Sequence, residues 1–397
     1  MKFRFVHHDS PLATAVFTFR AGSFADPQGQ EGISHHLEHV LLDASAKYPG
    51  EKHVTDAFGR LGAITNGGTG HSGVSYYGTC RAKKLLDMID IHCNLVSAPL
   101  LTDEDIERER QVVLSELKDY LDDATGVFFH EVKAGALGWA PIIGHEHTVA
   151  AITPDQMRRH YRRFHGSDNL MVVVCGPEPM EDEIRDRLSS LPVGDAPGYP
   201  GFATANLDDL NFTNPKFEQS QFALVGSDSP GLSAPFRDSL IASMASTCVA
   251  GPEFSLLFRR LRSDLGLCYW VSAGLLRHDD GGLLYVWSQF EPDKTETIRK
   301  ETLDTLARVA EDGIDEEIVR FTKDILLTSA AQTQETTAGR ANQFLSHRLA
   351  GASGVPDTYD EYEALVDGII SDEVSRFAAS HYGAMATKAK VVCMMPE

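Results

Sequence analysis

The spacing of apolar residues divides the chain into short strands and amphipathic helices. Ala15, Phe17 and Phe19 occupy every second position within residues 12–20, which predicts a strand. By the same criteria, further strands are predicted at 74–77 and 169–175, and helices at 32–44, 52–61, 82–96, 103–121 and 157–164. The helix at 103–121 has a clear start, because Thr102 is suited to cap it and three acidic residues follow. This mixture predicts an α+β protein.

The same order of elements restarts in the second half of the chain. Residues 282–287 resemble 73–78, residues 314–320 resemble 102–108, and the helix and strand ending at Cys393 resemble those ending at Cys175. We therefore expect an internal duplication that forms two homologous α/β-sandwich-type domains, each a mostly antiparallel sheet with helices packed on it. A stretch rich in Pro, Gly and Asn predicts a linker at 193–215 between domains at 1–192 and 216–397.

The charge of the protein limits its partners. Acidic residues outnumber basic ones by 57 to 36 in a chain of 397 residues, and the formal net charge is −21. Because nucleic acid binding needs clustered Lys and Arg, this balance argues against nucleic acid as a partner. It is compatible with basic or neutral peptides, or with a role in solubility alone.

The chain shows no pattern typical of a membrane or export segment. No stretch approaches 18 consecutive apolar residues, and the first residues lack the apolar core of a signal peptide. The six cysteines occur singly, without a C-x-x-C pair, which is typical of a reducing compartment. We therefore expect a cytoplasmic protein with no membrane partner.

Candidate chemistry lies in residues 32–39, GISHHLEH, which contain H-x-x-E-H. Positions i and i+4 of a helix share a face, so His35 and His39 can present two imidazoles to one metal ion. Glu38 stands beside them and is placed to act as a general base towards water activated by the metal. The alternative is a solvated, histidine-rich helix face without a metal.

A catalytic zinc site needs a third protein ligand. The helix predicted at 103–121 carries Glu109 and Glu116, which are seven residues apart and therefore share a face. Helix geometry alone does not choose between them. Without the histidines, either would be interpreted as an ordinary exposed carboxylate.

These residues resemble the pitrilysin/insulinase family of inverzincin metallopeptidases, which combine H-x-x-E-H with a glutamate pair seven residues apart on a later helix. The resemblance implies a zinc site with His35, His39 and Glu116 as ligands and Glu38 as the catalytic base. It also implies that Glu109 orients a ligand. The expected activity is that of a zinc-dependent endopeptidase cutting peptides or unfolded polypeptides inside a chamber.

The resemblance extends along nearly the whole chain, whose length is that of the family's processing-peptidase branch. Residues 66–69, Asn-Gly-Gly-Thr, resemble the family's Asn-Ala-x-Thr segment, which implies that Asn66 and Thr69 lie on an edge strand that binds substrate. Arg262 and Tyr269 match the family's paired arginine and tyrosine, which are expected to bind substrate and polarise the scissile carbonyl. Gly67 and Gly68 depart from this Asn-Ala-x-Thr pattern, and the departure concerns substrate preference.

The motif occurs only in the first half, and alignment of the halves places Thr328 opposite Glu116. A duplicated fold with one ligand set implies one Zn²⁺ per chain. The resemblance implies that two chains pair, and we expect a homodimer because one chain carries both half-sites, with a heterodimer with a second gene product as the alternative. Arg262 and Tyr269 would then serve the zinc site of either their own chain or the partner. Two alternatives from other classes remain: a non-catalytic, core-like subunit of a larger assembly, and a zinc-binding scaffold that captures peptides without cutting them.

Overall fold

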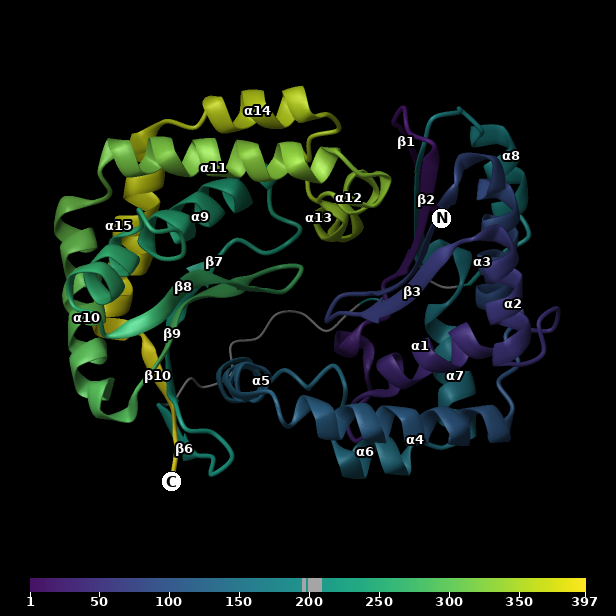
Figure 1. The fold of residues 1–397 in the computed structure, drawn as a ribbon, viewed down its shortest axis with the longest axis horizontal. Coiled ribbons are helices and arrows are strands. Elements are labelled where there is room, and N and C mark those ends of the chain that lie inside the picture. The colour runs from purple at the N-terminus through teal and green to yellow at the C-terminus, as the bar shows by residue number, and fades with distance from the viewer. Residues whose placement is uncertain (195–197, 199–208) are drawn as a thin grey trace. The chain divides into compact units, whose positions relative to one another are not determined.

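The computed structural model describes residues 1–194, 198 and 209–397. The chain forms two compact units (Figure 1). The first contains Met1–Tyr120, Ala140–Pro200 and Thr333–Leu345, and the second contains Leu121–Trp139, Gly201–Gln332 and Ser346–Glu397. Within the described residues, each unit is built on one five-stranded sheet.

The sheet of the first unit has the strand order β1-β5-β2-β4-β3. These strands are β1 (Lys2–His7), β5 (Leu170–Gly176), β2 (Leu12–Phe19), β4 (Val74–Arg81) and β3 (Ile64–Thr69). β1 and β5 are parallel, whereas the other neighbours are antiparallel. β3 is an edge strand that, in the described part of the chain, pairs with β4 alone.

Side chains of β2 alternate between the two faces of this sheet. Ala15, Phe17 and Phe19 point into the main core of the unit. That core is completed by α1 (Ile33–Asp43), α2 (Glu51–Leu61), α3 (Leu85–Ser97), α7 (Pro154–Phe164) and α8 (Glu181–Leu188). Thr14 lies at an alternate position, and its hydroxyl bonds that of Thr337 at 2.8 Å, so the short helix α12 (Thr337–Asn342) docks on β2 and β5.

The second unit repeats this plan with the strand order β6-β10-β7-β9-β8, in which β6 and β10 are the parallel pair. The strands are β6 (Leu210–Thr213), β10 (Lys390–Met395), β7 (Ser220–Ser229), β9 (Gly282–Phe290) and β8 (Cys268–Arg277). Helices α9 (Phe236–Val249), α10 (Thr295–Asp312) and α15 (Ser371–Lys388) pack together against this sheet. α5 (Ala124–Leu137) also packs on β7, and its Phe129 contacts Tyr285 and Trp287 of β9.

The predicted fold class is confirmed, because both units have helices packed on a mostly antiparallel sheet of equivalent strand order. The units themselves are not contiguous in sequence, since residues 121–139 belong to the second unit and 333–345 to the first. Of the linker predicted at 193–215, residues 195–197 and 199–208 lie outside the described residues, and Leu210–Thr213 form β6.

The structure bears on the expectations for membrane segments and for the cysteines. Among the described residues, no helix is both long enough and apolar enough to cross a bilayer. All six cysteines are buried and unpaired. Burial raises the pKa of each thiol, to about 12 for Cys93, so none has the thiolate character of a reactive cysteine.

Candidate metal centre

Helix α1 carries the H-x-x-E-H motif and is fixed at its first turn. Asp26 accepts hydrogen bonds from the amides of Gly32 and Ser34 at 2.8 and 3.2 Å, and from the Ser34 hydroxyl at 2.5 Å. The carboxylate thereby satisfies amides that the helix leaves unpaired. Gly32 has φ of 94°, and a Cβ there would lie 2.7 Å from the carbonyl oxygen of Ile143, so glycine is required.

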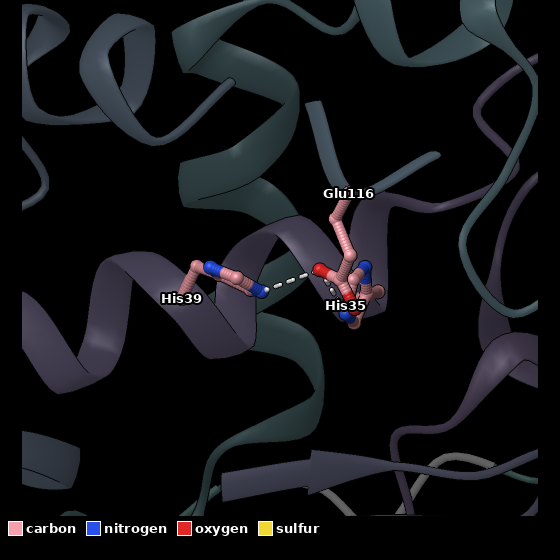
Figure 2. A group of neighbouring side chains, drawn as sticks. All are labelled: His35, His39 and Glu116. Atoms are coloured by element: carbon pink, nitrogen blue, oxygen red, sulfur yellow. Dashed lines mark ion pairs between the residues drawn. The ribbon is translucent and has the colours of Figure 1, made fainter. Parts of the chain in front are cut away.

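The three predicted ligands meet at one point (Figure 2). His35 and His39 lie one turn apart on α1 and face Glu116 of α4 (Asp103–Tyr120). Their Nε2 atoms lie 3.6 and 3.4 Å from the same oxygen, Oε2 of Glu116. One ligand atom from each residue lies within 4.8 Å of the other two. Helix periodicity left Glu109 and Glu116 as alternatives, and the structure brings Glu116 to both histidines.

Helix α4 packs against α1 and α6 (Glu146–Ala151), and it presents its two glutamates to different atoms of one imidazole. Oε2 of Glu109 lies 3.6 Å from Nδ1 of His39, whereas Glu116 faces Nε2. The buried Arg110 fixes α4 from another side by donating to backbone carbonyls within residues 149–152. Glu109 therefore occupies the place expected of a residue that orients a metal ligand.

The charges around the two histidines differ. Burial lowers the pKa of His35 to about 4, although Glu116 opposes this shift. Burial alone would also lower the pKa of His39, but polar contacts with Glu109 and Glu116 outweigh it and raise the pKa to about 9. The contact with His39 in turn lowers the pKa of Glu116. A cation at this point would replace the additional proton on His39, because a ligating imidazole must be neutral.

This donor set fits zinc. Two imidazoles and a carboxylate are ordinary ligands of catalytic zinc. Ligands placed about 2.1 Å from a tetrahedral ion are about 3.4 Å apart. The separations of 3.6 and 3.4 Å between the histidine Nε2 atoms and Glu116 match that spacing and exceed a normal hydrogen bond.

Glu38 lies on the same helix and turns towards β3. Its Oε2 accepts a 2.7 Å hydrogen bond from the Thr69 hydroxyl. Gly67 provides the space, because a Cβ there would lie only 2.4 Å from Oε1 of Glu38. Burial raises the pKa of Glu38, and the bond from Thr69 opposes that shift. We predicted that Thr69 contacts substrate, and in the structure its hydroxyl is hydrogen-bonded to Glu38, the predicted base.

The remaining predicted residues lie in two places. Asn66 is exposed on β3, and its Oδ1 accepts a bond from the Gly67 amide at 2.9 Å. In the second unit, Arg262 of the π-helix η4 (Phe258–Asp264) stacks on Tyr269 of β8, with Cζ 5.0 Å from the ring centroid. Tyr269 is 79% exposed. The predicted arginine–tyrosine pair is therefore assembled within one unit, and its role towards a zinc site stays a prediction.

Sequence reasoning missed two residues that shape the site, Asp43 and Arg108, and it connected Gly67 with substrate preference alone. Arg108 forms an ion pair with Asp43, and its Nε lies 3.5 Å from Oε1 of Glu109. The sequence held two indications of this pair. Asp43 follows His39 by one helical turn, and Arg108 directly precedes Glu109. For Gly67, the indication was a glycine pair inside a strand, which is typical of close approach by another group.

Two family models match the chain. The one described as insulinase, peptidase family M16, matches residues 5–140, which include Glu38 and the three predicted ligands. The one described as the peptidase M16 inactive domain matches residues 151–326, which include Arg262. The chain belongs to the insulinase family of peptidases, peptidase family M16. The family resemblance inferred from the motifs is therefore confirmed.

Known relatives share both length and fold with the chain. It is 24% identical over 380 residues to an uncharacterized zinc protease of Rickettsia felis, across 93% of this chain and 90% of that protein. A protease from Helicobacter pylori aligns with a TM-score of 0.88 at 15% identity, over 99% of this chain and 96% of that one. The peptidase M16 inactive domain from Pseudomonas fluorescens aligns with a TM-score of 0.85 at 17% identity, over 100% of this chain and 95% of that one. The solved structures show the fold, and the name of the Rickettsia relative agrees with a zinc site.

Proposed function

We propose that the protein is a zinc-dependent endopeptidase that hydrolyses peptides or unfolded polypeptides. The observation that carries this proposal is that Glu116 of α4 converges within 4.8 Å on His35 and His39 of α1, the helix that also bears Glu38. Zinc held by those three residues would supply Lewis acidity, the property by which catalytic zinc makes water nucleophilic near neutral pH.

Glu38 is the proton carrier in this proposal. Its carboxylate removes a proton from water as the water attacks the peptide carbonyl carbon, and it delivers that proton to the leaving amine nitrogen as the C–N bond breaks. Burial favours both steps, because it raises the pKa of Glu38 towards the range in which one group accepts and donates protons. The hydroxyl of Thr69 restrains the side chain between β3 and the metal centre.

The outer edge of β3 offers a binding place for an extended peptide. Residues 64–69 pair with residues 74–79 along one edge, and in the described chain the other edge has no strand partner. An extended peptide can join such an edge through main-chain hydrogen bonds, which depend little on sequence. Because Gly67 and Thr69 of this strand contact Glu38, a peptide bound there would lie close to the proposed base.

Cleavage of a quenched fluorescent peptide, with and without a chelator, tests this function. Glu38→Gln should retain zinc but lower kcat by about 100-fold or more, because a general base contributes at least that factor. Glu104→Gln, which changes an exposed carboxylate on α4, is the matched control and should cleave normally.

A Glu38→Gln variant that cleaves at the wild-type rate would overturn the proposal. A wild-type protein that binds zinc and peptide but cleaves nothing would support the alternative of a non-catalytic or peptide-capturing subunit. Zinc content and cleavage are therefore measured on the same samples.

We also propose that two copies of the chain pair, and that Arg262 and Tyr269 of one copy act at the zinc site of the other. Support comes from their arrangement in the second unit, where the guanidinium stacks on a largely exposed ring. An arginine and a tyrosine displayed together suit a role in binding a peptide and polarising its carbonyl.

A further inference from the structure

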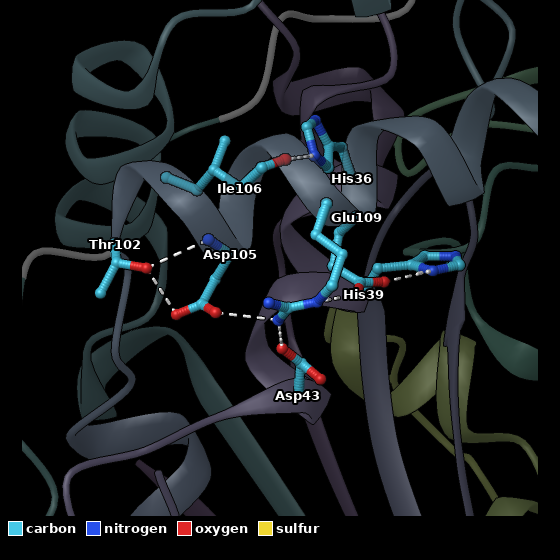
Figure 3. A network of polar contacts seen from close by, with 8 residues as sticks. His36, His39, Asp43, Thr102, Asp105, Ile106 and Glu109 are labelled. Atoms are coloured by element: carbon cyan, nitrogen blue, oxygen red, sulfur yellow. Dashed lines mark hydrogen bonds and ion pairs between the residues drawn. The ribbon is translucent and has the colours of Figure 1, made fainter. Parts of the chain in front are cut away.

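A cluster of charged side chains lies on the Nδ1 side of His39 (Figure 3). Asp43 follows His39 by one turn of α1, and Arg108 precedes Glu109 on α4. Arg108 pairs with Asp43 and donates a 2.8 Å hydrogen bond to Asp105. The guanidinium therefore joins the two helices that supply the metal ligands.

Both oxygens of Glu109 have a partner in this cluster. Oε2 lies 3.6 Å from Nδ1 of His39, and Oε1 lies 3.5 Å from Nε of Arg108. The side chains of Asp43 and Glu109 are 5% and 13% exposed, so water competes weakly for either carboxylate. Glu109 thus lies between the imidazole of His39 and the guanidinium of Arg108.

The cluster is fixed at its far end by the start of α4. The Thr102 hydroxyl donates to Asp105 at 2.6 Å and accepts from the Asp105 amide at 3.1 Å. A second link between the helices is the 2.9 Å contact between Nε2 of His36 and the carbonyl oxygen of Ile106. Arg108 is thus held on one side by the capped first turn of α4 and on the other by the last turn of α1.

We propose that Arg108, anchored by Asp43, is a positioning residue that holds Glu109 on Nδ1 of His39 and thereby sets the zinc affinity of the centre. The inference rests on the zinc site of the proposed function. With Glu109 in place, the imidazole proton stays on Nδ1 and Nε2 is available to ligate. Without Arg108, Oε1 of Glu109 loses its partner and Asp43 is left with an unpaired buried charge.

Zinc affinity of the full chain, measured by competition with a chromophoric chelator, tests the inference independently of cleavage. Arg108→Gln should weaken zinc binding about 10- to 100-fold, the usual effect of removing a group that orients a ligand. Arg108→Lys keeps the charge without the planar fork and should lose less. Asp43→Asn should also weaken binding, because Arg108 then loses its contact on α1.

A double-mutant cycle separates positioning from general stability. In a Glu109→Gln background, Arg108→Gln should change zinc affinity little further, because both residues act through the same carboxylate. If Arg108→Gln lowers affinity by the same factor in both backgrounds, Arg108 does not act through Glu109 and the inference is wrong. Should Arg108→Gln fail to fold, Arg108→Lys and Asp43→Asn complete the same cycle.

Arg158→Gln is the matched control. Arg158 pairs with Asp103 of α4 and Asp155 of α7, so it also joins α4 to a neighbouring helix. Within the described residues its polar contacts go to these two carboxylates and the carbonyl oxygen of Leu101, and not to Glu109. Its loss should leave zinc affinity unchanged, and equal affinities of the Arg108 and Arg158 variants would overturn the inference. A wild-type chain that binds zinc but cleaves no peptide would refute the endopeptidase while leaving this inference standing.

Discussion

The absence of a side chain at position 67 determines where the proposed general base can lie. A Cβ at Gly67 would come within 2.4 Å of Oε1 of Glu38 and within 2.8 Å of Cδ1 of Leu42. The carboxylate occupies that space and is bonded to Thr69 on the same strand. One residue of β3 thus provides room for the base, and another holds it.

Gly67→Ala should therefore lower kcat for peptide cleavage by about 10- to 100-fold, because a displacement of about 1 Å in a catalytic group has an effect of this size. Zinc content should stay at the wild-type level, since the atoms nearest to a Cβ at Gly67 belong to Glu38 and Leu42 and not to the three proposed ligands. Steady-state kinetics together with metal analysis measure both quantities.

Gly68→Ala provides the control for this substitution. Among the described residues, no atom beyond Gly68 and its two chain neighbours lies within 4 Å of a Cβ built there, so the same methyl group one residue further along should leave kcat unchanged. Equal activity of the two variants would show that Glu38 does not need the space at Gly67.

At the level of single residues, the three side chains that converge at the candidate metal centre were predictable, and the residues that support them were not. His35 and His39 follow from one short motif, because four residues make one helical turn. Glu116 needed family resemblance, since Glu109 shares its helix face. The pair of Asp43 with Arg108 spans 65 residues of sequence, and contacts over that distance depend on how α1 and α4 pack.

Two histidines of the first unit are buried, one in helix α7 and one at its C-terminal cap. Burial lowers the pKa of His160 and of His165 from 6.5 to about 3. Nε2 of His160 contacts the Ser34 hydroxyl at 2.9 Å, and Nε2 of His165 contacts the Tyr76 hydroxyl at 3.2 Å. Both imidazoles are therefore neutral in the folded protein over a pH range in which the unfolded chain protonates them.

The free energy of unfolding should fall as the pH drops from about 6.5 towards 4, by about 1.4 kcal/mol per pH unit for each such histidine. In this range the unfolded chain binds the proton and the folded chain does not, so acid favours unfolding. Asp26 acts in the opposite direction, because burial raises its pKa to about 7. Urea unfolding of metal-free protein at several pH values measures the slope.

A variant separates the contribution of one histidine to this pH dependence from that of Asp26. His165→Gln should reduce the acid slope by about 1.4 kcal/mol per pH unit relative to the wild type. An unchanged slope in the His165 variant would mean that its imidazole is protonated in the folded state.

Among the elements, long helices with marked ends were the most predictable. The helix expected at 103–121 is found at Asp103–Tyr120, because Thr102 accepts from the Asp105 amide and fixes its start. The six-residue helix α12 could not be predicted, since it is too short to show periodicity. Its position depends on Thr14, which lies 323 residues away from Thr337 in sequence.

For the whole molecule, the question is whether the arginine–tyrosine pair serves its own chain or a partner. If it serves the partner, a mixture of Glu38→Gln chains and Arg262→Ala chains should regain about a quarter of wild-type activity after subunit exchange. The mixed dimer then contains one zinc site with an intact base that faces an intact Arg262. Cleavage assays after mixing, with sedimentation to confirm the dimer, make the measurement.

A mixture of Glu38→Gln and His39→Ala chains is the control, because both defects affect the zinc-binding unit and no combination restores a site. No regain in the first mixture, with dimers present, would place Arg262 in the same chain as the zinc site that it serves. A protein that is active only as a monomer would refute the proposal of a shared site.

Two segments of the chain cross from one unit to the other, and they affect how the protein can dissociate after cleavage. Residues 121–139 join the second unit and residues 333–345 return to the first, so each sheet is covered by a helix that the other half of the sequence encodes. A single proteolytic cut at any site from 140 to 332 would yield two fragments, each with a helix folded into the unit of the other. Their separation would expose Thr14 on one sheet and the aromatic contacts of Phe129 on the other to water. A nicked molecule would therefore stay assembled without a covalent link.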